Sequence, residues 1–362
     1  MPDVKAQDWI GRIKKGESDA TAALLVTLFS NVKSLTVSTC DDISGSLLFR
    51  TLEKMALSVA KHNSRALGAF RELSEIEIRG AKEHTRGPGR YGTYGDGELI
   101  AVFMMLPSVR VIKGYRVIWF GSGWPYEPVT SSVKEISLES SQIDSKLMME
   151  CLKGSERLER FTYNQDSVLY SVATWEPRLI VKALRKYAGK SLVHLELTGD
   201  DSGLPSRPAD DEPFIGTLRS FQVLRSIRLM TMMLFKLVDG DDIDEDVDMI
   251  QSALKNRGEP HSLVELRRLV DFLPLSAEKL ELVGGISDEE AQDIFADLPE
   301  LKGERVPILG DIVLEDSDPL ERDTKDLCKK AGIRLKSTKR VVNRYQRIYA
   351  VTKPEPQVLL ER

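Results

Sequence analysis

The chain has 362 residues, a length that suits either two globular domains or one long repeat array. Hydrophobic residues make up 41% of the sequence and charged residues 30%, so the chain carries enough apolar surface to fold and is not a disordered protein. Its formal net charge is -5 and no basic stripe stands out in the sequence, which argues against nucleic acid and anionic membranes as partners.

The cysteines and the apolar stretches indicate the compartment. Cys40, Cys151 and Cys328 lie far apart without a CxxC pair, so neither a disulfide framework nor a zinc site is predicted. The N-terminus is polar and charged, and no apolar stretch is long enough to span a membrane. We therefore predict a cytoplasmic or nuclear protein without a bound cofactor or metal.

Residues 1–30 are predicted to form a helical N-terminal cap, because apolar residues recur at helical spacing between Trp9 and Phe29. A short apolar phrase then recurs along the chain, with two residues between its first and second leucine-like positions and one between its second and third. It occurs at Val32/Leu35/Val37, Leu73/Ile76/Ile78, Val133/Ile136/Leu138, Leu158/Phe161/Tyr163, Leu192/Leu195/Leu197, Leu224/Ile227/Leu229, Ala277/Leu280/Leu282 and Leu309/Ile312/Leu314, with a broken copy at Val109/Ile112.

Each phrase predicts a half-buried strand, because alternate strand residues point to opposite faces and the last two apolar residues then share the inward face. Segments with helical periodicity usually precede the phrases, at residues 22–29, 67–70, 99–106, 147–152, 179–187 and 263–273. A strand that alternates with a helix at periods of roughly 20 to 29 residues is the unit of a leucine-rich repeat. We therefore predict an α/β fold, an irregular leucine-rich-repeat solenoid or horseshoe with one parallel sheet and helices on its convex side.

The repeats are predicted to be degenerate and to span residues 31–335. Only two spacings between central phrase residues are regular, 24 residues from Ile112 to Ile136 and 25 from Ile136 to Phe161. Polar, turn-rich segments explain the longer spacings, and we predict inserted loops near residues 80–97, 200–212 and 239–260. A helix at 324–331 and a last strand at Ile333/Leu335 are followed by a predicted C-terminal cap and tail at 336–362.

A doubly wound α/β enzyme, with a site formed by long loops, is the alternative for this alternation of strands and helices. Central strands of such sheets are continuous apolar runs buried on both faces. Here the apolar residues alternate with Ser, Thr, Glu and Arg. The strand pattern favours the solenoid, and we predict a non-catalytic protein-protein interaction scaffold rather than an enzyme.

The phrases and their surroundings resemble the leucine-rich-repeat region of fungal F-box/leucine-rich-repeat proteins. The resemblance covers most of the chain and is carried by residues 8–37, 106–117, 131–163, 191–199 and 269–284. It implies a recognition module, often the substrate-binding half of a ubiquitin-ligase receptor. An F-box itself is not evident before Ala22, so direct binding to the ligase adaptor is not expected.

Motifs that could carry chemistry are better explained as loops. Gly87, Gly89 and Gly92 spell GxGxxG, but the preceding strand is predicted to end at Ile78, too early for a dinucleotide fingerprint. The acidic run at 239–248 lacks the glycine and the final glutamate of an EF-hand loop. None of the four histidines stands at a metal-binding spacing from another, and Cys151 is expected to be a small core residue on a helix.

Two surfaces are candidates for binding a partner. The outward strand positions carry eight acidic and four basic residues, which predicts a protein partner with a basic patch. These are Glu75, Glu77, Glu135, Glu139, Glu196, Glu281, Asp311 and Glu315, against Arg79, Arg160, Arg228 and Lys279. The loop at 119–128 gathers aromatic residues that are either partner anchors or a cap on the core, namely Trp119, Phe120, Trp124 and Tyr126.

Overall fold

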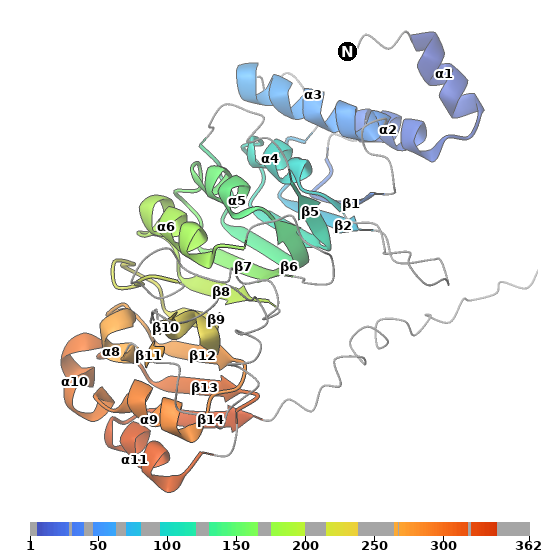
Figure 1. Ribbon diagram of the computed structural model, residues 1–362. Helices are drawn as coiled ribbons and strands as arrows, with labels where there is room; N and C mark the ends of the chain where they lie inside the picture. Colours follow the sequence, from blue (N-terminus) through green and yellow to red (C-terminus); the bar gives the residue numbers. More distant parts are fainter. Residues whose placement is uncertain are drawn as a thin grey trace, which may run out of the picture.

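The computed structural model describes residues 6–28, 31–39, 46–62, 70–80, 95–120, 130–165, 175–199, 215–237, 264–266, 268–317 and 320–338. These residues form an α/β fold around one large parallel sheet, in which ten strands follow one another in chain order (Figure 1). The predicted inserted loops fall largely at residues 81–94, 200–214 and 238–263, of which only 95–96 and 264–266 at their edges belong to the described part.

The ten ordered strands are parallel, and each pairs with the strand before it and the strand after it. They are β1 (Ser34–Thr39), β2 (Glu75–Gly80), β4 (Val111–Tyr115), β6 (Glu135–Ile143), β7 (Arg160–Gln165), β8 (His194–Thr198), β9 (Ser226–Met230), β12 (Lys279–Val283), β13 (Asp311–Glu315) and β14 (Arg334–Thr338). Two short strands, β3 (Gly95–Asp96) and β5 (Val117–Trp119), extend the sheet beside β6, and β10 (Phe235–Leu237) pairs antiparallel with β11 (Val264–Leu266).

Helices connect the strands, as parallel pairing requires. They are α1 (Ala6–Lys14), α2 (Ser18–Leu28), α3 (Leu47–His62), α4 (Glu98–Met104), α5 (Ser145–Leu152), α6 (Pro177–Ala188), α8 (Leu269–Phe272), α9 (Asp288–Phe295), α10 (Leu298–Arg305) and α11 (Arg322–Lys330), with a 3-10 turn η2 at Thr231–Leu234. Figure 1 shows α4, α5 and α6 succeeding one another along one side of the sheet. No described helix combines the length and the apolar content that crossing a bilayer requires.

The register of the sheet confirms the predicted strand phrases. The central apolar residue of each phrase pairs with the central residue of the next, in the row Leu35, Ile76, Ile112, Ile136, Phe161, Leu195, Ile227, Leu280, Ile312 and Leu335. The third apolar residues form a parallel row two positions further along. From Ile76 to Ile312 every member of the first row is fully buried. One continuous core therefore runs through the sheet, because neighbouring strands present the same inward positions.

The broken copy at Val109/Ile112 has a steric cause. Its third position is Gly114, where a Cβ atom would lie 2.6 Å from Leu138 Cδ2 and 2.8 Å from Val117 Cγ2. The chain turns at Arg116, which has a positive φ of 53°, and then enters β5 with Val117 fully buried. Val117 thus fills the space that the missing side chain leaves, and only glycine fits beside it.

The N-terminal helices form a small unit against the first repeat. Asp19 in α2 accepts hydrogen bonds from the backbone N–H groups of Leu47 (2.6 Å) and Leu48 (3.2 Å), at the start of α3. Ala20 and Ala23 pack against Leu47 in a core cluster separate from the main one. These helices occupy the residues predicted as the cap, although α3 itself was not anticipated.

Three sequence expectations about the connecting segments are corrected. Residues 263–273 were expected to be one helix, but β11 takes residues 264–266 and only Leu269–Phe272 are helical. The helix expected at 67–70 lies mostly outside the described residues, and Phe70 has a positive φ of 64°, which excludes a regular helix there. At the C-terminal end, α11 and the positive φ of Gly332 (67°) match the prediction, while β14 continues to Thr338, beyond the expected boundary at 335.

Candidate functional site

The outward face of the parallel sheet lies between the two inward rows and is the predicted partner surface. Its central row runs through Thr36, Glu77, Lys113, Ser137, Thr162, Glu196, Arg228, Glu281, Val313 and Lys336 in register. The outer row includes Glu75, Glu135, Arg160, His194, Lys279 and Asp311. Five predicted binding residues, Glu75, Glu77, Glu135, Glu196 and Glu281, are thus placed on one face, together with Arg228.

This face carries much less net charge than the sequence count indicates. Three basic residues on outward positions, Lys113, Arg334 and Lys336, were not counted, so eight carboxylates stand against seven cations. Most of them are paired across strands: Lys113 with Glu75 (2.7 Å), Arg79 with Glu77 (2.7 Å), Arg160 with Glu135 (3.7 Å) and Arg334 with Asp311 (2.7 Å). The acidic excess that predicted a basic partner is therefore largely cancelled within the face.

Arg228 on β9 is the centre of a carboxylate cluster that joins four successive strands. Its guanidinium donates to Glu281 on β12 (Nη1 to Oε2, 2.8 Å) and, with both terminal nitrogens, to Glu315 on β13 (2.9 Å each). Its Nε lies 3.3 Å from Glu196 Oε1 on β8, without the alignment of a hydrogen bond. The four side chains are only 16–24% exposed, so the pairing is well shielded from solvent. We call Glu196, Arg228, Glu281 and Glu315 the Arg228 cluster.

The Arg228 cluster is charged at neutral pH. Burial by itself would lower the pKa of Arg228, but the carboxylates of Glu315, Glu196 and Glu281 outweigh it and raise this pKa. Burial would likewise raise the pKa of Glu281, yet Lys279 and Arg228 together lower it. The cluster thus keeps a fixed geometry, because each charged group is held by partners on neighbouring strands.

His194 extends this cluster towards the middle of the sheet. Its Nδ1 lies 3.1 Å from Ser226 Oγ, and its Nε2 lies 3.8 Å from Glu196 Oε2. The side chain is 16% exposed and faces the outward side of β8, as the strand pattern predicted. The involvement of Glu315 and His194 was not foreseen, because the spacing within one phrase gives no information on contacts between strands several repeats apart.

The aromatic loop is not supported as a partner site at Trp119. Trp119 is 3% exposed and packs over Gly97, where an added Cβ would overlap its side chain. It therefore belongs to the core beside the broken repeat, and its assignment to partner binding is wrong. Phe120 is 38% exposed, whereas Trp124 and Tyr126 lie outside the described residues. Glu139, the remaining predicted residue, is exposed at the end of the outward face of β6.

Reactive groups elsewhere in the described chain are buried or dispersed. Burial raises the pKa of the Cys151 thiol and of the Cys328 thiol to about 12, so neither is a nucleophile at neutral pH. Cys151 lies in α5 at 2% exposure, as expected of a small core residue. Among the described residues, no group of histidine, cysteine and acidic side chains could hold a metal ion. The glycine-rich and acidic segments fall outside the described residues.

Neither a protein family model nor a curated protein matches this sequence. The outward face of the sheet, with the Arg228 cluster as its most ordered part, is therefore the site from which a function is proposed.

Proposed function

We propose that this chain is a leucine-rich-repeat solenoid that acts as a non-catalytic scaffold and binds a protein partner on the outward face of its sheet. The strand order supports this proposal, since ten parallel strands pair in chain order and each contributes the same two inward positions. A solenoid of this kind curves with its sheet on the concave side and its helices on the convex side. The strands then align their outward residues as rows on one surface.

The observation that carries the proposal is the ordered charge pattern on that face. Side chains already held by cross-strand pairs lose little conformational entropy when a partner binds, so they favour specific recognition. The Arg228 cluster fixes four charged groups from four strands in this way. Since the face is nearly neutral overall, we expect complementarity to individual charges rather than a general attraction to basic proteins.

The resemblance to F-box-type receptors suggests the kind of partner. In such receptors the repeats hold the substrate of a ubiquitin ligase. Substrate recognition by this chain is an extension of the scaffold proposal and needs its own evidence, namely faster turnover of the partner when the chain is present. The scaffold proposal itself requires only that the partner bind to the sheet face.

The proposal is tested with a partner isolated by cross-linking and then purified, so that binding is measured between two defined proteins. The variant Glu135→Lys/Glu139→Lys reverses two outward charges on β6. The matched control, Glu150→Lys/Glu156→Lys, makes the same charge change in α5 and in the turn after it. We expect at least tenfold weaker binding for the sheet-face variant and less than a twofold change for the control. Equal losses, or a larger loss in the control, would contradict binding at the sheet face.

A further inference from the structure

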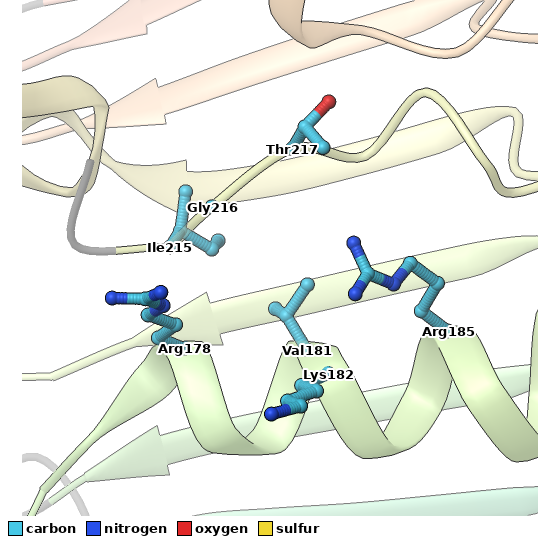
Figure 2. Close-up of a pocket in the computed structure, with 7 residues that line it drawn as sticks. All are labelled: Arg178, Val181, Lys182, Arg185, Ile215, Gly216 and Thr217. Carbon is cyan, nitrogen blue, oxygen red and sulfur yellow. The ribbon is translucent and has the colours of Figure 1, made fainter. Parts of the chain in front are cut away.

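The helix side of the sheet carries a pocket of quite different character. It is a cavity of about 170 Å³ between α6 and the segment at residues 215–217 (Figure 2). Arg178, Lys182 and Arg185 line it from α6, and these positions are four and three residues apart, so they share one side of the helix. Buried Val181 lies between the two arginines, and Ile215 closes the other side.

Figure 2 shows how the charged side chains are arranged. Arg178 and Arg185 stand on the side of α6 that faces residues 215–217, whereas Lys182 lies along the near side of the helix. Gly216 has a positive φ of 74°, and its missing side chain leaves open space at the rim of the pocket. The pocket thus has cationic walls and a small apolar floor.

The two segments that form the pocket are exceptionally basic for this chain. Residues 177–193 and 215–227 contain seven cations and no aspartate or glutamate, although the chain as a whole has 56 acidic and 51 basic residues. The seven are Arg178, Lys182, Arg185, Lys186, Lys190, Arg219 and Arg225. Of these, Arg225 is paired with Glu278 at 3.3 Å. Within the described part of the chain, Lys182 and Arg185 form no ion pair.

Such an arrangement has an energetic cost in the absence of an anion. Like charges at i and i+4, as in Arg178/Lys182 and Lys182/Lys186, destabilise a helix by about 0.2–0.5 kcal/mol per pair. A bound anion removes this repulsion and gains charge-assisted hydrogen bonds from the guanidinium groups. The sequence alone did not show this basic surface, because folding assembles it from two segments that are separated along the chain.

We propose that this pocket binds a phosphoryl group, either as the phosphate ion or as a phosphate monoester. Arginine forks match two phosphate oxygens at once, and a lysine adds a point charge to a doubly charged group. The cavity has the size of a small headgroup, and no aromatic side chain lines it to stack on a nucleobase. The ligand is therefore recognised by its phosphoryl group. The pocket lies on the helix side, so this inference does not depend on the proposed function of the sheet face.

The test is calorimetric titration of the full chain with inorganic phosphate, at constant ionic strength adjusted with sodium chloride. A second arm uses O-phosphoserine with serine as its control. We expect saturable 1:1 binding of both phosphate compounds and none of serine. Tighter binding of O-phosphoserine than of phosphate would identify an ester as the ligand, and the reverse would identify the free ion.

Two double variants with equal charge loss separate a site from diffuse attraction. Lys182→Gln/Arg185→Gln changes two exposed residues that line the pocket, whereas Lys190→Gln/Arg219→Gln changes two exposed residues of the same basic surface that do not. We expect at least tenfold weaker phosphate binding for the first and less than a twofold change for the second. Phosphate should also raise the melting temperature of the wild type but not of the first variant. Equal weakening by both variants, or no saturable binding by the wild type, would overturn the proposal.

Discussion

Replacing Leu195 by alanine tests whether the inward row is one continuous core. Leu195 lies on β8 near the middle of the sheet and is fully buried. It pairs in register with Phe161 on β7 and Ile227 on β9, which are themselves fully buried. The alanine variant removes three carbon atoms from a site that is enclosed on both sides by strands.

The expected loss of stability follows from how little this site can collapse. Leucine-to-alanine changes in protein cores cost about 2.7–5.0 kcal/mol, and the cost grows with the cavity that remains. Backbone ladders to β7 and β8's other neighbour β9 hold the walls in place. We therefore expect about 3–4 kcal/mol, in the upper part of that range. Leu195→Asp should be still more disruptive, because it buries an unpaired carboxylate.

Urea unfolding followed by circular dichroism measures the loss, and hydrogen exchange locates it. In a repeat array, protection should fall most in β7, β8 and β9 and remain high in the terminal strands, since each repeat contacts only its neighbours. The control is Leu275→Ala, the same chemical change at a side chain that is 60% exposed, where we expect a change within about 0.5 kcal/mol. A loss below about 1 kcal/mol for Leu195→Ala, or a uniform loss of protection, would refute the repeat-by-repeat core.

Three further outcomes concern charged groups. Arg228→Ala leaves three carboxylates without their shared partner, and urea unfolding should show a loss of about 2 kcal/mol, with less than 0.5 kcal/mol counting against the cluster. The lowered pKa of Glu281 stabilises the fold fully above the ordinary glutamate pKa of about 4.3, and this contribution disappears as pH falls through the folded-state pKa. Glu281→Gln should therefore flatten the fall of stability below about pH 5, and an unchanged profile would contradict this. Burial raises the pKa of Asp96, so its ionised form is unfavourable at neutral pH. Asp96→Asn keeps an oxygen to accept from the backbone N–H of Glu98 (2.8 Å), and thermal melts should show a gain at pH 7 that vanishes at acidic pH, where Asp96 is protonated in the folded and unfolded chains.

The strands were predictable because their signal is local and repeated. A side chain's inward or outward direction in a strand depends only on its parity, and the requirement to bury the same two positions recurs in every phrase. The paired rows from Leu35 to Leu335 are the direct result. The helices α4, α5 and α6 were found for the same reason, since each follows its own apolar periodicity near a phrase.

The errors arose where a segment's role depends on distant parts of the chain. Residues 264–266 (Val-Glu-Leu) fit a helix or a strand equally well over three positions, and pairing with β10 decides for the strand. Trp119 stands beside glycines and prolines, as a loop anchor would, yet β5 inserts it into the core. The compensation of charge on the sheet face likewise depends on register between strands, which the count of outward residues did not include.

The irregular spacing of the repeats is compatible with a regular sheet because chain length between strands has little energetic weight. Ile227 and Leu280 are 53 positions apart, more than twice the spacing of Ile136 and Phe161, yet both pairs lie in register on adjacent strands. Doubling a flexible connection costs only about 0.6 kcal/mol of closure free energy, which is small beside the burial of one leucine. Additional residues can therefore enter between strands, as the antiparallel pair β10 and β11 does between β9 and β12, without shifting either inward row. The outward rows keep their alignment for the same reason, so a binding surface on the sheet is preserved even where the repeats differ widely in length.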